Sequence, residues 1–310
     1  MIDKRTLLYT IENTTQTTLG EWLDTHQFPR KTMKEFFGAK SVRLDGQLCM
    51  AKSELSEGMV LEIIPLKERI DHDPIEMSLI IAYEDEDILI VDKASGITMN
   101  SKGQVSLANG VAHYFKAHKI YGKVRFLNRL DRDTSGLVVV AKHGLAQHFY
   151  QIQMDNNRLE KWYRATVQGR LTQEHEVLEL PIRKSADGIH QEVHPEGVMT
   201  KTEYEVLSYD ATEDTTDVRI RLWTGKTHQI RVTMAHIGHP LVHDPLYADA
   251  GVMGSKQSAW RIEDAQCHKG LLQEVANTAE IQDREKTFAL RAYRLVCYHM
   301  RTGAQITVEV

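Results

Sequence analysis

The sequence lacks the features that mark secreted and membrane proteins. Its 310 residues include only 3 cysteines (Cys49, Cys267 and Cys297), and their odd number and wide spacing exclude a complete disulfide framework. No apolar run approaches the roughly eighteen residues of a membrane-spanning helix. The N-terminus has neither the apolar segment nor the small-residue cleavage site of a signal peptide. These absences predict a cytoplasmic protein with reduced thiols and no membrane partner.

Basic residues are not in excess, since the net charge is −5. This balance disfavours a protein that binds nucleic acid through bulk charge alone. The basic residues are nevertheless gathered locally. The stretch from Arg30 to Arg43 contains five basic residues and only one acidic residue. The stretch from Lys119 to Asp133 contains five more basic residues. Such patches on an acidic chain suit a selective nucleic-acid partner, although ordinary solvated surfaces can show the same pattern.

The first 68 residues are expected to form a small α/β unit. Two helices are predicted from apolar spacing and two short strands from turn signals, at residues 19–23, 30–37, 41–44 and 59–64. So small a unit has too little core to be very stable alone. A polar linker is predicted at residues 69–75.

Residues 76–310 are expected to form one larger α+β domain with a mixed, mainly antiparallel sheet. Strands are predicted at residues 80–83, 88–92, 137–141, 163–169, 202–207 and 218–222 and within 288–310. Helices are predicted at residues 107–118, 146–158 and 227–238.

The densest polar cluster is Asn128–Gly136, NRLDRDTSG, directly before the apolar run Leu137–Ala141. It resembles the start of a calcium loop, but the twelfth position, which needs a glutamate, is Lys142. A phosphatase of the dehalogenase type would place its aspartates after the strand. Two interpretations remain: a turn whose side chains satisfy backbone donors, or a loop that presents a carboxylate nucleophile between arginines.

The segment Leu222–Arg231, LWTGKTHQIR, contains the Gly-Lys-Thr of phosphate-binding loops. Such a loop needs a glycine five residues before Gly225, where this chain has Ile220. Histidines are frequent here and beyond, but their spacing fits no zinc-protease helix or Cys/His knuckle, so no metal site is expected. These histidines are His228, His236, His239 and His243.

A third cluster lies on the predicted strand around Tyr163. Lys161, Tyr163 and Ala165 alternate with their neighbours and therefore share one face of a strand. Taken alone, Tyr163 is explained equally well as an ordinary half-buried core tyrosine.

Taken together, these segments resemble the RluA-type pseudouridine synthases. NRLDRDTSGLVVVAK (Asn128–Lys142) is similar to the family's central motif, commonly written HRLDxxTSGLxxxAK. The strand around Tyr163 and the segment TGKTHQIRV resemble the two motifs that follow it, in the same order. The resemblance covers about residues 75–310. Residues 18–66 resemble, more weakly, the small RNA-binding module of a small-subunit ribosomal protein.

The resemblance implies an enzyme that isomerises uridine to pseudouridine in structured RNA, either ribosomal or transfer RNA, after flipping the base out. The reaction needs no cofactor, and the enzyme is expected to be a monomer. The resemblance makes Asp131 the essential carboxylate, either as nucleophile or as base. It makes Tyr163 the residue that stacks on the uracil and is expected to help remove the proton from uracil C5. Arg231 is expected to pair with Asp131 through two hydrogen bonds and keep it ionised. The candidate RNA-binding residues are Arg129, Arg132, Lys226, His228, Arg30, Lys31 and Lys34.

The chain departs from the family pattern at several positions, which leave the implied aspartate, tyrosine and arginine in place. The departures are Asn128 and Arg291 for His, Lys226 for Arg, Ala94 for Pro and His243 for Gly. They bear on the choice of substrate. The alternative function is a non-catalytic RNA-binding or ribosome-assembly protein that keeps the synthase fold.

Overall fold

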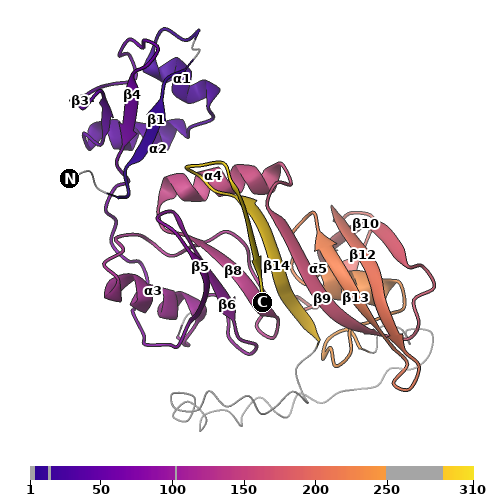
Figure 1. Ribbon diagram of the computed structural model, residues 1–310. Coiled ribbons are helices and arrows are strands. Elements are labelled where there is room, and N and C mark those ends of the chain that lie inside the picture. Colours follow the sequence, from indigo (N-terminus) through magenta and orange to yellow (C-terminus); the bar gives the residue numbers. More distant parts are fainter. Residues whose placement is uncertain (1–3, 13–14, 102, 249–288) are drawn as a thin grey trace. The chain divides into compact units, whose positions relative to one another are not determined.

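The computed structural model describes residues 4–12, 15–101, 103–248 and 289–310, and its described part forms two compact units (Figure 1). The first unit comprises Met1–Leu130, Gly136–Lys161 and Tyr293–Val310, and the second comprises Asp131–Ser135 and Trp162–Ala292. Cys267 lies outside the described residues. No helix in the described part of the chain is both long and apolar enough to cross a membrane.

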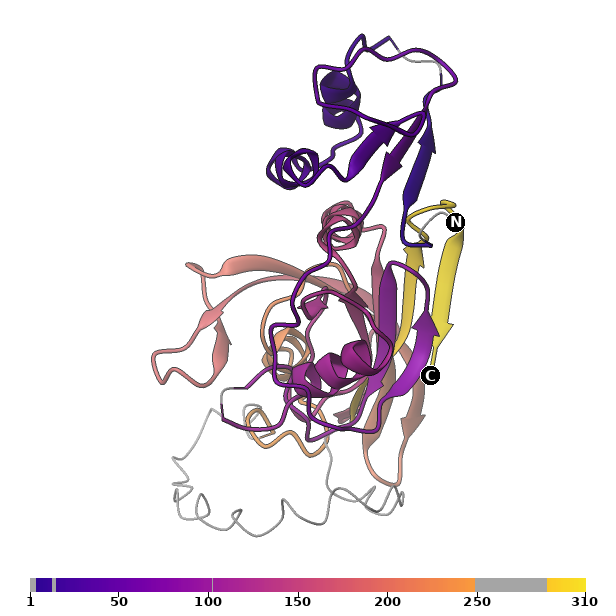
Figure 2. The ribbon, with the colours of Figure 1, turned by 90° about the vertical axis from the view of Figure 1, so that its left-hand side faces the viewer.

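The N-terminal part of the first unit has a four-stranded sheet with strand order β1-β4-β2-β3. Its elements are β1 (Leu7–Thr10), α1 (Leu19–Thr25), α2 (Arg30–Gly38), β2 (Val42–Leu44), β3 (Gln47–Leu48) and β4 (Val60–Ile63). The view in Figure 2 shows both helices on one side of this sheet. Thr18 and Glu21 form a capping box that starts α1. The two predicted helices are confirmed, and β1 and β3 were not foreseen.

The segment predicted as a linker has no strand or helix, but hydrogen bonds hold it and the residue before it to other parts of the first unit. The Asp71 carboxylate accepts the backbone N–H of Val124 at 2.9 Å, and Arg125 donates to Glu68 at 2.5 Å. The Asp71 bond holds the segment itself, and the Glu68 bond holds the residue directly before it, to residues that follow α3 (Leu107–Ala117). The domain boundary at residues 69–75 stays a prediction.

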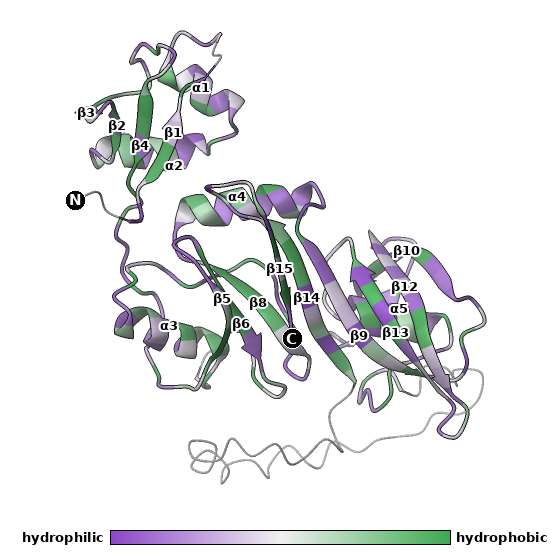
Figure 3. Cartoon of the chain, viewed as in Figure 1, coloured by the Kyte–Doolittle hydropathy of each residue, from purple (hydrophilic) through white to green (hydrophobic). Residues whose placement is uncertain are grey.

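The rest of the first unit is built on strands in the order β14-β8-β6-β5, with β15 on β14 and β7 on β8. The strands are β5 (Ile80–Glu84), β6 (Ile88–Lys93), β7 (Arg125–Phe126), β8 (Ser135–Ala141), β14 (Leu290–Tyr298) and β15 (Gln305–Glu309), and the helices are α3 (Leu107–Ala117) and α4 (Gly144–Asp155). Figure 3 shows β8 hydrophobic along its length. All residues of Leu137–Ala141 are buried, so both faces of β8 are covered, as its continuous apolar run predicts.

The second unit contains strands in the order β11-β10-β12-β13-β9 and the helix α5. Its elements are β9 (Glu160–Gln168), β10 (His175–Lys184), β11 (Gln191–Val193), β12 (Val198–Asp210), β13 (Thr215–Leu222) and α5 (Gln229–His236). Figure 1 shows α5 behind β12 and β13, and α5 contacts β10, β11 and β12. The pairings of β10 with β11 and β12, and of β12 with β13, are antiparallel, which confirms the predicted α+β class.

The helix predicted at residues 227–238 is confirmed, but it is shorter. It begins only after His228, because that residue adopts a left-handed conformation (φ 55°, ψ 19°) that cannot belong to the helix. Every residue from Gln229 to Ala235 is buried, so this stretch of α5 has no solvent-exposed face.

A buried ionic cluster joins the start of the chain to the first unit's sheet. Arg301 donates two hydrogen bonds to the carboxylate of Asp87, at 2.7 and 2.8 Å, and others to backbone carbonyls, including that of Thr6 at 2.9 Å. His143 contacts the same carboxylate at 2.9 Å. The Asp87 side chain is fully buried. Its burial opposes ionisation, but the bonds from Arg301 and His143 outweigh burial and lower the Asp87 pKa to about 2.

This cluster predicts a defined dependence of stability on pH. Because the folded-state pKa of Asp87 lies below its ordinary value of 3.8, its stabilising contribution is present above about pH 4 and is lost as the pH falls towards about 2. Arg301→Met strands a buried carboxylate and should lower the free energy of unfolding by about 3–5 kcal/mol at pH 7. Urea denaturation between pH 7 and pH 2.5 should show this deficit shrinking below about pH 4. A deficit that stays constant with pH would contradict the assignment.

Candidate active site

The loop that carries Asp131 leads into β8. Asn128, just before it, is buried; its side-chain amide donates to the Leu137 carbonyl at 3.0 Å and accepts the Val139 N–H at 2.8 Å. The Asp131 carbonyl accepts the N–H of Thr134 at 3.3 Å. Part of this polar cluster therefore serves the turn, as one of the two interpretations expected. Asn128, a departure from the family pattern, has a structural role here, while the Asp131 side chain stays 24% exposed.

Arg231 is the best-anchored residue of the site. Its Nε and Nη2 donate to the two carboxylate oxygens of Asp244 at 2.8 and 2.6 Å. Its Nη1 points to Asp131 Oδ2 at 3.4 Å. Burial would lower the pKa of Arg231, but the hydrogen bonds and charge of Asp244 outweigh burial and raise it. Arg231 therefore remains a cation inside the protein.

The predicted partnership of Arg231 was correct in its contact and wrong in its geometry. Arg231 does lie within salt-bridge distance of Asp131, but its two-bond partner is Asp244. The Asp244 side chain is fully buried and also accepts the backbone N–H groups of Leu246 and Tyr247 at 2.9 and 3.3 Å. Three sources of donors thus fix Asp244, and Asp244 in turn fixes Arg231.

His228 also lies beside the carboxylate of Asp131. Its Nε2 is 3.7 Å from Asp131 Oδ2, and its Nδ1 is 3.0 Å from the Tyr247 hydroxyl. Burial, together with the nearby Arg231 charge, lowers the pKa of His228 despite the opposing charges of Asp131 and Asp244. His228 is therefore a neutral imidazole at neutral pH. It was predicted to bind RNA, and the structure places it next to the candidate nucleophile.

Tyr163 lies on β9 with only 4% of its surface exposed. Its burial, and secondarily the negative charge of Asp131, raise the pKa of its phenol. The hydroxyl is thus kept protonated. Lys161 and Ala165, which share its face of the strand, are also buried, so the predicted alternation along this strand is confirmed.

The remaining candidate residues lie on exposed surface. In the second unit, Arg132 forms two hydrogen bonds with Asp133, and Lys226 is exposed at the turn before α5. In the first unit Arg129, Lys31 and Lys34 are exposed, whereas Arg30 donates to both carboxylate oxygens of Asp24 at 2.8 and 2.6 Å. RNA contact by these residues stays a prediction.

Sequence reasoning missed Asp244 and Tyr247 as site residues. Both lie in the segment Gly238–Tyr247, where the spacing of the residues assigns no partner to either of them. An aspartate thirteen positions after a buried arginine gives no local signal, because the turn that follows α5 brings the two together. Among the described residues, no group of three His, Cys, Asp or Glu side chains is placed to hold a metal ion.

Comparison with known proteins identifies the class. Residues 87–236 match the family model described as RNA pseudouridylate synthase. The chain is 33% identical over 219 residues to an RNA pseudouridine synthase of Bacillus subtilis, YjbO, covering 68% of this chain and 76% of that protein. It is 32% identical over 301 residues to ribosomal large subunit pseudouridine synthase D of Salmonella typhimurium, covering 93% and 86% of the two chains.

A solved structure has the same fold. Human RNA pseudouridylate synthase domain containing 1 superposes with a TM-score of 0.54 at 21% identity, covering 75% of this chain and 83% of that one. The chain therefore belongs to the RluA-type family of RNA pseudouridine synthases.

Two ion pairs of equal geometry but different burial are predicted to contribute very differently to the free energy of unfolding. Arg231–Asp244 and Arg30–Asp24 have the same pair of distances, 2.8 and 2.6 Å. The side chains of the first pair are 5% and 0% exposed, and those of the second 84% and 42%. Arg231→Ala should lower the free energy of unfolding by about 3–5 kcal/mol, whereas Arg30→Ala should have little measurable effect.

Chemical denaturation of the two variants measures this difference. A double-mutant cycle with Asp244→Ala should show that the second substitution costs far less once Arg231 is gone. Equal losses for the buried and the exposed arginine would contradict the assigned role of the Arg231–Asp244 pair.

Proposed function

We propose that this enzyme converts uridine in RNA to pseudouridine with Asp131 as its essential carboxylate. The bond between ribose C1′ and uracil N1 breaks, the uracil turns, C1′ bonds to C5, and the hydrogen of C5 is replaced on the base by one at N1. No atom or electron is gained from outside. The observation that carries the assignment is that Asp131 is a carboxylate with one oxygen restrained and the other available.

The restraint falls on one oxygen only. Both the Arg231 and the His228 nitrogen that approach Asp131 are aimed at Oδ2, at 3.4 and 3.7 Å. No hydrogen bond engages Oδ1 within the described residues. A group that must attack a sugar carbon, or remove a proton from one, needs an oriented carboxylate with a free lone pair. The geometry supplies both properties and serves either chemical route.

The charge balance of the site supports the same assignment. Arg231 carries one positive charge between two carboxylates, Asp131 and Asp244, and binds Asp244 through its two short bonds. Asp131 is thus oriented by a cation without being locked in a two-bond pair. Breaking the C1′–N1 bond develops positive charge on the ribose, which an incompletely neutralised carboxylate stabilises.

Tyr163 is assigned a stacking role. Its ring is buried beside Asp131 and its raised pKa disfavours the phenolate. An aromatic ring that keeps its proton can hold a flipped uracil by stacking, but it is a weak base for removing the C5 proton. Tyr163→Phe should therefore retain most of the uracil contact.

The RNA is proposed to be ribosomal. The relatives include enzymes named for the ribosomal large subunit, and a target base paired in a helix must be flipped out to reach a half-buried aspartate. We further propose that the enzyme acts as a cytoplasmic monomer. Transfer RNA is the second substrate to be tested, and both can be assayed by tritium release from transcripts labelled at uracil C5.

The non-catalytic alternative is not favoured, because the relatives are named as synthases and the chain keeps the aspartate, tyrosine and arginine that the family motif implies. It would be distinguished by RNA binding without tritium release from any transcript.

Asp131→Asn should abolish product formation while RNA binding and the unfolding midpoint stay close to those of the wild type. The expected loss in the single-turnover rate is at least about 10³-fold, because an amide is neither a nucleophile nor a base. Asp133→Asn is the matched control in the same loop and should keep most of the activity, since Asp133 pairs with the exposed Arg132. Near wild-type tritium release by Asp131→Asn would refute the assignment.

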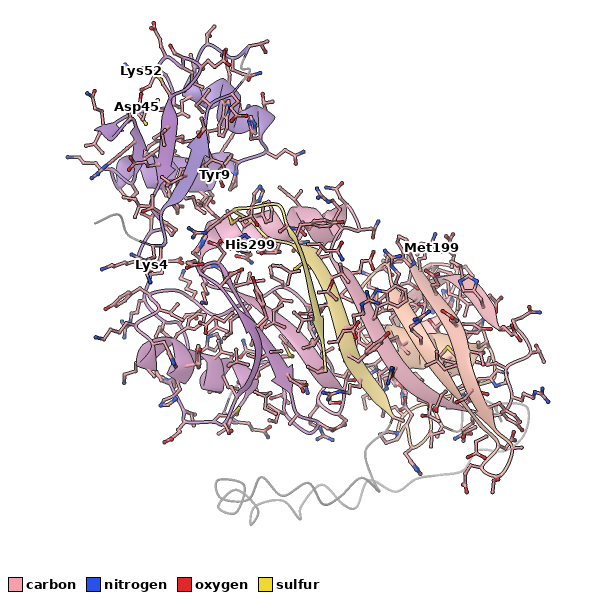
Figure 4. All side chains as sticks on the ribbon, in the orientation of Figure 1. Lys4, Tyr9, Asp45, Lys52, Met199 and His299 are labelled. Atoms are coloured by element: carbon pink, nitrogen blue, oxygen red, sulfur yellow. The ribbon has the colours of Figure 1, made fainter. Side chains whose placement is uncertain are left out.

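The N-terminal module is proposed to contribute RNA affinity through α2. Lys31 and Lys34 are exposed on this helix and form no ion pair among the described residues. Replacing both with Gln should weaken binding and reduce the slope of log affinity against log salt by about 1–2. Lys52, labelled in Figure 4 at the end of the module away from Tyr9, supplies the control Lys52→Gln. An unchanged slope in the double variant would show that α2 does not contact phosphate.

A further inference from the structure

The site contains a chain of hydrogen bonds that the proposed chemistry does not yet use. It runs from the backbone N–H of Gln191 to the Tyr247 hydroxyl at 2.8 Å, and from that hydroxyl to His228 Nδ1 at 3.0 Å. His228 Nε2 then lies 3.7 Å from Asp131 Oδ2. Every member lies in the second unit, and the chain ends on the candidate reactive carboxylate.

The direction of this chain follows from its two ends, because the Gln191 N–H can only donate and the Asp131 carboxylate, which faces His228 Nε2, can only accept. A backbone N–H can only donate, so Tyr247 Oη accepts from Gln191. The Tyr247 hydroxyl forms no other hydrogen bond to a side chain among the described residues, so its own proton is directed at His228 Nδ1. Burial raises the pKa of Tyr247 and lowers that of His228, which keeps the phenol protonated and the imidazole neutral. A neutral imidazole that accepts at Nδ1 carries its proton on Nε2.

The backbone of His228 is also constrained. Its left-handed conformation is uncommon for a residue with a Cβ and persists where the surroundings dictate it. Edge-to-face contact with the Tyr247 ring, at a centroid distance of 5.7 Å, adds a second restraint on the imidazole.

We propose, given the function proposed above, that His228 is a positioning residue for Asp131: held as its Nε2–H tautomer by Tyr247, it restrains Oδ2 together with Arg231 and so leaves Oδ1 as the reactive oxygen. Its neutrality matters. A second cation beside Asp131 would bind the carboxylate more tightly and lower its reactivity, whereas a neutral N–H orients it. The contacts of Arg231 and His228 with Oδ2, at 3.4 and 3.7 Å, are expected to shorten to hydrogen-bond length when RNA fills the site.

Protonation of His228 should therefore slow the reaction. The groups that face it are Asp131, Arg231, Asp244, Tyr247 and His190, and their combined effect with burial keeps it neutral at pH 7. Because the pKa of His228 lies below its ordinary value of 6.5, the imidazole gains a proton at Nδ1, and loses the bond from Tyr247, only in acid. The wild type should then show an acid limb in its single-turnover rate that lies below pH 6.5.

Two amide substitutions separate positioning from other roles. His228→Gln places an amide N–H where Nε2 lies and cannot be protonated. His228→Asn tolerates the left-handed backbone but is too short to reach Asp131. His236→Gln is the matched control, because His236 is an exposed histidine at the other end of the same helix.

The experiment measures single-turnover rates, at saturating enzyme and from pH 5 to 8, on a transcript from which the wild type releases tritium. His228→Asn should lower the rate about 10- to 100-fold with the half-saturating enzyme concentration unchanged within about threefold. His228→Gln should recover to within about fivefold of the wild type and lack the acid limb. His236→Gln should match the wild type, and thermal melting should confirm that each variant is folded.

Three outcomes overturn the proposal. The first is a wild-type rate in His228→Asn. The second is weakened RNA saturation with an unchanged rate in both amide variants, as expected of a residue that only binds RNA. The third is an acid limb that persists unchanged in His228→Gln. Failure of the function proposed above gives a different result, because the wild type itself would then release no tritium from any transcript.

Discussion

The candidate active site depends on a buried ion pair that does not include Asp131, the carboxylate proposed to react. Arg231 and Asp244 bind each other through two short hydrogen bonds in an environment with almost no solvent. Because a buried guanidinium is costly unless it is fully paired, Asp244 is what allows Arg231 to be there at all. The remaining guanidinium nitrogen, Nη1, is then available to contact Asp131. Asp244 thus stabilises the Arg231 cation, and that cation in turn orients Asp131.

This arrangement resolves a conflict between two requirements of the catalytic role proposed for Asp131. The carboxylate has to be oriented, and the strongest way to orient it is a two-bond pair with arginine. The same pair would occupy both of its oxygens. Giving the two bonds to Asp244 leaves Asp131 with a single 3.4 Å contact from Arg231 and a neutral neighbour in His228. An oriented but reactive group follows from this division of partners.

The sequence predicted those parts of the structure that local patterns encode. The apolar run Leu137–Ala141 predicted a strand buried on both faces, and the spacing of Leu19, Trp22 and Leu23 predicted α1. Strand β10 was missed because its residues are half-exposed and alternate weakly between apolar and polar. The two-bond partner of Arg231 was misassigned for another reason: choosing between Asp131 and Asp244 requires the three-dimensional path of the turn after α5. Motif resemblance pointed to Asp131 and Arg231, which are in contact, but no local rule could show that Asp244 takes the two short bonds of Arg231.

The most direct test is a crystal structure of the enzyme with RNA that carries 5-fluorouridine at the modified position, where fluorine replaces the hydrogen that must leave C5. The account predicts that Asp131 Oδ1 lies within about 3.5 Å of C1′ or C2′ of the flipped nucleotide. It also predicts that Tyr163 is stacked on the base and that Arg231 is still bonded to Asp244 through both oxygens. A ribose that lies against a different carboxylate, or an Arg231 that has left Asp244 to form a two-bond pair with Asp131, would contradict it.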